Sequence, residues 1–186
     1  TIDSVATALA RHKIGYVSED RKYEGLILMH SVRRNVAVTI WRRIARALGW
    51  LPDGAEKKAV MPYIERLKVR TPSLAQPVAL LSGGNQQKIS VAKWLAAGVR
   101  VLIIDEPTVG IDIQTKGYLH ELIHELAAQG TAIILISSDM PEMISLADRI
   151  VVMGGFRVLG SLDNDHDIGR MGEAIMARIH KIDEAA

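Results

Sequence analysis

The most informative stretch of the sequence is Val101-Leu102-Ile103-Ile104-Asp105-Glu106-Pro107-Thr108, in which four apolar residues precede two adjacent carboxylates. Such a run is typical of a strand buried on both faces of a parallel sheet, and open α/β sheets bind ligands at the carboxyl ends of their strands. Burial of a carboxylate is costly unless a cation or donor compensates it, which favours Mg²⁺ at Asp105. Glu106 can point at a water molecule and act as a general base. The alternative is an acidic pair that caps a neighbouring helix.

The rest of the chain extends this strand into an α/β pattern. The runs 132–136 and 150–153 predict two more strands buried on both faces. An amphipathic helix ending at Gly130 is predicted between the first two strands by apolar residues at i, i+3, i+4 and i+7, namely Leu119, Leu122, Ile123 and Leu126. Strand, helix and strand form a crossover, which indicates a parallel sheet. A second crossover is expected through a helix at 141–147, and Gly154-Gly155 predicts a hairpin into 156–159.

The region 32–69 has a different pattern and predicts a helical subdomain inserted into the α/β core, over about residues 32–98. One helix is predicted by an apolar stripe that is broken near Gly49 and Pro52 and consists of Ala37, Ile40, Trp41, Ile44 and Leu48. A second helix is predicted at 56–68, with Pro62 as a kink or stop. We expect one partial domain over 1–162 and a polar, weakly helical tail over 163–186.

Composition excludes several classes of protein. The chain has 186 residues, 48% of them hydrophobic, with a net charge of +2, which predicts one soluble globular unit and no dedicated nucleic-acid binder. It contains no cysteine, so a disulfide framework and a thiolate metal site are excluded. No apolar run approaches the length of a membrane span, so we expect the chain not to cross a membrane by itself.

A second motif is Leu81-Ser82-Gly83-Gly84-Asn85-Gln86-Gln87-Lys88, which precedes a helical pattern. The glycines allow close approach of a phosphate, Ser82 can cap the helix or bind a phosphate oxygen, and a helix N-terminus favours an anion. An ordinary loop with a serine cap is the alternative.

Together, the two motifs resemble the signature segment and the Walker B strand of ATP-binding cassette (ABC) ATPases. Val109-Gly110-Ile111-Asp112 resembles the D-loop of this family, and Ile136-Ser137-Ser138-Asp139 stands in the place of its switch loop. Residues 16–22, 25–26 and 31–35 resemble the second cassette of tandem ATPases that energise monosaccharide import, of the ribose and galactose type. The resemblance runs from about residue 14 to residue 160 and implies an incomplete core of the P-loop NTPase type.

The sequence departs from the family pattern at three places. No Gly-Lys dipeptide is present, so the phosphate-binding P-loop is missing, and we expect a truncated cassette that cannot assemble the usual ATP pocket by itself. Glu19 stands where the family usually has Gln, and Ser138 stands where it usually has His. Both replacements occur in second cassettes of the sugar class, so we interpret them as marks of a subfamily; the alternative is that both are ordinary turn residues.

The resemblance implies roles for individual residues. Glu106 and Ser138 would be catalytic, and Asp105 and Glu19 would hold Mg²⁺. Nucleotide contacts are implied for Leu81, Ser82, Gly83, Gly84, Gln86, Asp112 and Glu19. Two cassettes of this family meet head to tail, so the signature segment would act on ATP bound by the partner cassette.

The implied cofactors are ATP and Mg²⁺. The implied partners are a second cassette, sugar permease subunits in the membrane and, indirectly, a periplasmic sugar-binding protein, whereas nucleic acid is not expected. The implied location is the cytoplasmic face of the cell membrane.

Two alternative functions stay open. An ABC ATPase that acts on DNA ends would carry long coiled coils, but no sustained heptads occur between Glu19 and Leu81. A non-catalytic remnant that folds and binds a partner cassette is the other possibility. His120 and His124 have the spacing of a helical metal site, yet without a third ligand a solvated helix face is the preferred interpretation.

Overall fold

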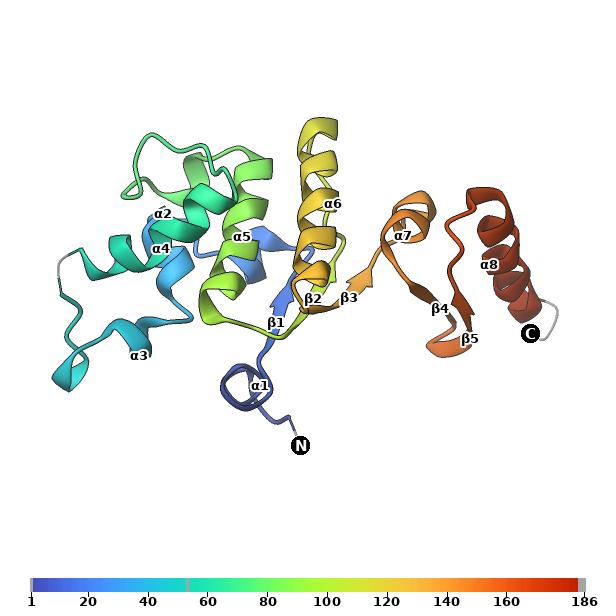
Figure 1. The fold of residues 1–186 in the computed structure, drawn as a ribbon, viewed down its shortest axis with the longest axis horizontal. Helices are drawn as coiled ribbons and strands as arrows, with labels where there is room; N and C mark the ends of the chain where they lie inside the picture. The colour runs from blue at the N-terminus through green and yellow to red at the C-terminus, as the bar shows by residue number, and fades with distance from the viewer. Residues whose placement is uncertain (1, 53, 184–186) are drawn as a thin grey trace. The chain divides into compact units, whose positions relative to one another are not determined.

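The computed structural model describes residues 2–52 and 54–183, and the chain divides into two compact units, Thr1–Ile136 and Ser137–Ala186 (Figure 1). The predicted boundary at residue 162 stays a prediction, and residues 184–186 of the predicted tail lie outside the described residues. The first unit contains α1 (Val5–His12), β1 (Ile14–Val17), η1 (Arg21–Gly25), α2 (Val32–Ala37), α3 (Trp41–Ile44), η2 (Ala47–Gly49), α4 (Ala55–Arg66), η3 (Val78–Leu80), α5 (Gly83–Ala97), β2 (Val101–Asp105), α6 (Ile113–Ala128) and β3 (Ala132–Ile136). The second unit contains α7 (Met140–Leu146), β4 (Arg149–Gly154), β5 (Arg157–Asp163) and α8 (Ile168–Asp183).

The first unit is built on a parallel three-stranded sheet in the order β1-β2-β3. The predicted crossover is confirmed: β2 leads through α6 into β3, and both strands lie where the apolar runs predicted them. β1 was not predicted as a strand, because four residues that include Gly15 and Tyr16 give no clear apolar run.

One face of this sheet is covered by helices and the other is open to solvent. The ring of Trp94 in α5 lies against Gly15, where an added Cβ would come within 2.9 Å of it. Tyr16, Ile103 and Ile134 are register partners that point to the opposite face. The exposed fractions are 41% for Tyr16, 52% for Ile134 and 47% for Ile136. The expectation that β3 is buried on both faces is therefore wrong.

Among the described residues from Val32 to Ala97, the regular elements are all helical and are joined by turns and loops. The single helix predicted from the stripe at 37–48 is wrong, because the chain breaks into α2, α3 and η2, with extended backbone at Ala45. The run Val36-Ala37-Val38-Thr39-Ile40 contains four β-branched residues, which lose side-chain freedom in a helix and so favour a break there. The second predicted helix is confirmed as α4, and it continues through Pro62.

The predicted amphipathic helix between β2 and β3 is confirmed as α6. Its apolar stripe is buried, with exposed fractions of 2–6%, and consists of Leu119, Leu122, Ile123 and Leu126. Its acidic N-cap is Asp112. The side-chain period of the sequence was sufficient to place this helix.

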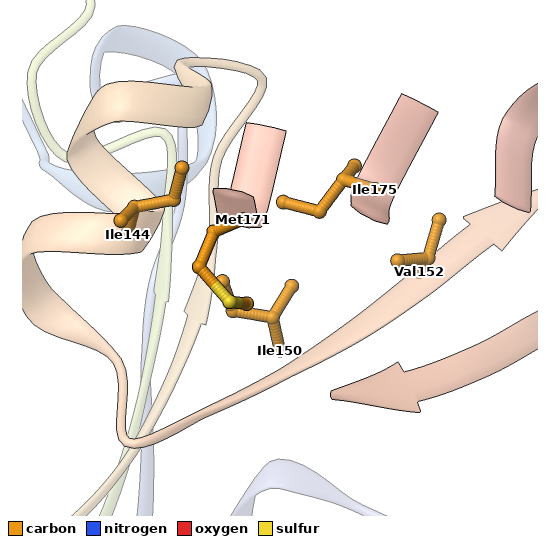
Figure 2. Packing of buried hydrophobic residues seen from close by; sticks show 5 residues of the cluster. All are labelled: Ile144, Ile150, Val152, Met171 and Ile175. Carbon is orange, nitrogen blue, oxygen red and sulfur yellow. The ribbon is translucent and has the colours of Figure 1, made fainter. Parts of the chain in front are cut away.

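The second unit has its own apolar core. Figure 2 shows Ile144 of α7, Ile150 and Val152 of β4, and Met171 and Ile175 of α8 pointing toward one another. The helix expected at 141–147 is found one residue earlier as α7, and the weakly helical tail contains α8.

β4 pairs antiparallel with β5. The expected second crossover from β3 through α7 into this strand stays a prediction. The predicted hairpin is confirmed. Gly155 and Phe156 both have positive φ, 53° and 59°, which is the backbone of a two-residue type I′ turn. This tight turn makes the local antiparallel pairing of β4 with β5 favourable.

None of the helices formed by the described residues combines the length and the apolar character that a membrane span requires.

Candidate functional site

Asp105 is the last residue of β2 and lies at the carboxyl edge of the parallel sheet. Its Oδ2 accepts a hydrogen bond of 2.7 Å from the hydroxyl of Tyr16 in β1. This bond raises the pKa of Tyr16 above 10.0, because it favours the protonated phenol beside a carboxylate. The hydrogen bond fixes the orientation of the Asp105 carboxylate at the edge where a ligand would bind.

Glu106 follows directly and has a left-handed backbone, with φ of 44°. A non-glycine residue rarely adopts this conformation, and such strain is concentrated at functional sites. Its main-chain N–H donates to the carbonyl of Ile136 at 2.9 Å, so the end of β3 holds the turn in place. The side chain of Glu106 is half-buried.

Glu19 lies two residues beyond the end of β1 and is exposed. The turn around it is tied by two side chains. The hydroxyl of Ser18 donates to Glu24 at 2.8 Å, and the Asp20 carboxylate accepts from the N–H groups of Lys22 and Tyr23 at 3.2 and 3.1 Å. Because parallel strands end at one edge, Glu19 belongs to the same edge as Asp105 and Glu106.

Ser82 is the N-cap of α5, one of the two roles that the sequence left open for it, and its exposed side chain accepts from the N–H of Asn85. Leu81 precedes it, and Gln86 lies one turn into the helix with 6% exposure. The Gln86 amide donates to the carbonyls of Val78 and Leu81, each at 3.2 Å. Gln86 therefore stabilises the loop from inside, and a nucleotide contact would require loss of these bonds.

The two glycines at the start of α5 lie where no side chain would fit. A Cβ on Gly83 would lie 3.0 Å from the carbonyl oxygen of Gly110, and one on Gly84 would lie 2.7 Å from Oγ1 of Thr115. The start of α5 thus packs against the loop and helix that follow Glu106. The structure brings the signature-like and D-loop-like segments together, although about 25 residues separate them in sequence.

Asp112 caps α6 and is exposed. Its carboxylate accepts from the N–H and the hydroxyl of Thr115 at 2.9 and 2.8 Å. These two donors stabilise the ionised form and lower the pKa of Asp112 below its usual range. Asp112 is therefore an anion at neutral pH, and its structural role is that of the N-cap of α6.

Ser138 belongs to the second unit, between β3 and α7, and is exposed. Its neighbours form a compact turn: Ser137 donates to the buried Glu142 at 2.7 Å, and Asp139 accepts from the Glu142 N–H at 3.0 Å. Ser138 and Glu106 lie in different units. The first unit therefore gives the placement of Glu106 and does not give that of Ser138.

The residues present fit a magnesium ion whose coordination shell is completed by the phosphates of a nucleotide. Within residues 2–52 and 54–183, no group of three or more His, Asp or Glu side chains is gathered as a metal cage. Mg²⁺ at nucleotide sites commonly takes one or two carboxylates together with phosphate and water oxygens. Asp105, oriented by Tyr16 at the sheet edge, is a suitable carboxylate of this kind, and Glu19 is a second oxygen donor on the same edge.

Sequence reasoning missed two residues of this region, Tyr16 and Arg21. Tyr16 was quoted only as part of a motif, and its bond to Asp105 joins residues 89 positions apart. Arg21 donates to the carbonyls of Val109 and Gly110 at 3.1 and 3.3 Å. The alternation of β1 could have indicated that Tyr16 faces the same side as the acidic strand end, whereas no local signal points to the contacts of Arg21.

Comparisons with known proteins agree with this arrangement. A protein of Burkholderia ambifaria named for ribose, galactose and methyl galactoside import is 46% identical over 162 residues, which cover 87% of this chain and 31% of that protein. The ribose import ATP-binding protein RbsA of Geobacillus kaustophilus is 45% identical over 154 residues, covering 83% and 31%. The chain thus spans about a third of the length of the curated relatives it matches.

Solved structures show the same fold. A nucleotide-free cassette from an ABC transporter gives a TM-score of 0.73 at 16% identity, covering 90% of this chain and 67% of that one. A dimeric cassette in a post-hydrolysis state with ADP and Pi gives 0.68 at 21% identity, covering 84% and 65%. The family model described as ABC transporter matches residues 2–109. With more than half of its length matched by that family and its sheet and helices arranged as in solved cassettes, the chain belongs to the ABC transporter family of ATP-binding cassettes.

Proposed function

We propose that this chain is the part of an ATP-binding cassette that carries the signature, Walker B and D-loop segments, and that it serves ATP-driven import of a monosaccharide. The observation that carries the proposal is the packing of Gly83 and Gly84 against Gly110 and Thr115. This contact places a serine-capped helix N-terminus beside the loop that follows two carboxylates. The proposal of a sugar as cargo is supported by the names of relatives at 45–46% identity.

In this proposal the chain takes part in two nucleotide sites. Ser82 and the two glycines bind the γ-phosphate of ATP held by a partner cassette, since a helix N-terminus with small residues admits a phosphate and its dipole stabilises the charge. Leu81 and Asp112 would flank the same surface, and the buried Gln86 would support it from inside through its bonds to the Val78 and Leu81 carbonyls. Asp112 is an anion that caps α6, so it would act by holding the start of this helix at the interface.

Asp105, Glu19 and Glu106 serve the second site, which is the cassette's own. Bound Mg²⁺ would supply neutralisation of phosphate charge there. Asp105 would hold it with the carboxylate that Tyr16 orients, and Glu19 would add a ligand from the end of β1. Glu106 accepts a proton from the attacking water, and Ser138 stands at the position from which the switch loop would contact the γ-phosphate.

A groove in the helical region supports a permease as partner. A cavity of about 550 Å³ is lined by His30, Arg33, Arg34, Trp41 and Lys57, among others. Trp41 and Arg33 both contact Glu56, at 2.8 and 3.5 Å, which holds one wall in place. We propose that this basic groove receives a cytoplasmic helix of the permease, which places the cassette on the inner face of the membrane. The periplasmic sugar-binding protein would act only through the permease, and nucleic acid has no role.

The decisive experiment uses a chimaera in which this chain replaces the matching 154 residues of the Geobacillus relative, reconstituted with that relative's permease. Ser82→Arg should abolish sugar uptake and ATP-driven closure, because the long side chain fills the space for the partner's phosphate. The matched control is Ser4→Arg, which removes another exposed serine cap, that of α1. Uptake at the normal rate in the Ser82→Arg chimaera would remove Ser82 from the nucleotide interface and overturn the proposal.

The alternative is a folded remnant that binds a partner cassette without catalysis. It is distinguished by the unmodified chimaera, which should hydrolyse ATP only if the chain is a working cassette part. The isolated chain should bind MgATP very weakly under either function, since no P-loop cradles the triphosphate. Calorimetry that gave micromolar affinity for the isolated chain would contradict both.

A further inference from the structure

The side chain of Arg21 connects the turn after β1 to the loop after β2. Its Nη1 donates to the carbonyl of Val109 at 3.1 Å and its Nη2 to that of Gly110 at 3.3 Å. A planar guanidinium presents two donors in a fixed fork, which suits two successive carbonyls better than the single ammonium of a lysine. Nε of Arg21 is buried and makes no hydrogen bond within the described residues, so the two carbonyls are what hold the guanidinium.

The same guanidinium lies against the start of α5. An added Cβ on Gly83 would come within 3.0 Å of Nη2 of Arg21 and equally close to the Gly110 carbonyl oxygen. Nη2 therefore fills the space between the start of α5 and the loop at Gly110, two segments that lie far apart in the sequence. Any side chain at position 83 would push Arg21, the loop at Gly110 or both away from α5.

At its other end, Arg21 is fixed to the turn that carries Glu19. The Arg21 N–H donates to the Glu19 carbonyl at 3.0 Å, and Asp20 caps the π-helical turn η1 that begins at Arg21. An added Cβ on Gly25 would lie only 3.3 Å from the Cβ of Arg21, so this turn is tightly wound. The guanidinium and the Glu19 main chain consequently move as one body unless this turn unwinds.

The contacts continue from Val109 to the catalytic candidate. The Val109 N–H donates to the Glu106 carbonyl at 3.3 Å, and Gly110 has a φ of +68°, a left-handed backbone that favours glycine. Arg21 thus holds a loop whose other end is the strained residue Glu106. Through its side chain and its main-chain N–H, Arg21 contacts, directly or through one hydrogen bond, each segment to which a nucleotide role is proposed in the first unit.

We propose that Arg21 is a positioning residue that fixes the D-loop segment and the start of α5 relative to Glu19, and so couples the cassette's own nucleotide site to the surface that acts on the partner's nucleotide. The identity of the two sites rests on the proposed function. A shift of Glu19 on nucleotide binding is transmitted through η1 and the guanidinium to Gly110 and Gly83. The two half-sites of one cassette are then not independent.

The linkage is tested first in the chain itself by amide hydrogen exchange. In Arg21→Gln, the amides of Val109 and of Asn85 and Gln86 at the start of α5 should exchange about tenfold faster or more, because the loop and helix start lose their common contact. Arg21→Lys should give a smaller increase, since one donor of two is retained. The matched control is Lys22→Gln, which removes a positive charge from the adjacent exposed position of the same turn and should leave these amides unchanged.

A second variant approaches the same contact from the other side. Gly83→Ala should displace Arg21 and raise exchange at Val109, although the substitution lies in α5. Exchange that rises in α5 alone, with Val109 protected as before, would overturn the linkage. Normal exchange at all of these amides in Arg21→Gln would also overturn it, whatever nucleotide the cassette binds.

The coupling is tested in the Geobacillus chimaera by steady-state ATP hydrolysis. Arg21→Gln should lower kcat by about fivefold or more and leave KM for ATP within about twofold, because positioning rather than binding is lost. The coupling would be overturned if Lys22→Gln lowered kcat as much as Arg21→Gln does. It would also be overturned if Arg21→Gln changed KM alone. A chimaera whose unmodified chain hydrolyses no ATP would contradict the proposed function instead, and the exchange results would then decide the linkage by themselves.

Discussion

The phenol of Tyr16 donates to Oδ2 of Asp105 at 2.7 Å, and so joins the exposed face of β1 to the last residue of β2. The two strands are adjacent and parallel, and Asp105 lies two residues beyond Ile103, the register partner of Tyr16. The bond is therefore a diagonal contact across one face of the sheet. Because one oxygen of Asp105 accepts this bond, the orientation of the whole carboxylate is fixed, as a metal-binding aspartate requires.

Tyr16→Phe should lower the free energy of unfolding at pH 7 by about 0.5–1 kcal/mol, a modest value because the side chain is 41% exposed. The folded pKa of Tyr16 is raised, so the stabilisation is complete below pH 10 and is lost as the pH rises through the folded pKa. Urea unfolding of both proteins between pH 7 and 11 measures this. Tyr23→Phe, at an exposed tyrosine, is the control, and a pH-independent difference would contradict the assignment.

Lys93 predicts a pH effect of opposite sign. Burial lowers its pKa to about 8, while Nζ donates to the Gly25 carbonyl at 2.6 Å and lies 4.9 Å from the Trp94 ring centroid. The unfolded lysine keeps its proton to about pH 10.4, so between pH 8 and 10.4 the unfolded state binds more protons and stability rises with pH. Relative to Lys93→Met, the wild type should gain up to about 3 kcal/mol across this window. Denaturation of both proteins at several pH values checks it, Lys22→Met serves as control, and a constant difference would refute it.

Gly84→Ala should destabilise the chain by about 1–3 kcal/mol, because its Cβ would lie 2.7 Å from Oγ1 of Thr115, which Asp112 holds in place. Gly117→Ala in α6 is the matched control: nothing lies within 4 Å of its Cβ, so it should stabilise by about 0.5–1 kcal/mol. Thermal unfolding gives both values. Combining Gly84→Ala with Thr115→Ala should restore part of the loss, and strict additivity would show that the contact is unimportant.

Glu106→Gln in the chimaera should abolish hydrolysis at the site it serves while ATP binding stays largely intact, because the general base alone is lost. Glu121→Gln, on an exposed position of α6, is the control. Single-turnover hydrolysis and nucleotide binding are measured in parallel. Equal loss of binding and turnover would make Glu106 a structural residue.

The sequence was most informative where one periodicity extends over a long element. The stripe of α6 could be predicted because four apolar positions at helical spacing are all buried. The region 32–48 could not, because its stripe has helical spacing while its β-branched run disfavours a continuous helix, and packing decides between the two. β1 was missed because four residues are too few to show a period.

For the candidate site, the residues with local signals were found and those with distant partners were not. Capping was one of two roles left open for Ser82, and the structure shows the cap, which involves residues only three apart. Arg21 lies 88 positions from Val109, so its contacts follow from the order of strands, which sequence patterns leave open. The same holds for Tyr16 and Asp105. Long-range contacts of this kind decide the geometry of the site.

The open side of β3 affects how this chain behaves in a test tube. Ile134 and Ile136 are about half exposed, and within the first unit β3 pairs with β2 along one edge. Unpaired main-chain groups beside apolar side chains form a template on which strands of other molecules add. Concentrated preparations of the isolated chain should therefore self-associate and lose material on storage. A charged substitution such as Ile134→Lys, which acts as a gatekeeper against such growth, is the first change to make before any biophysical work.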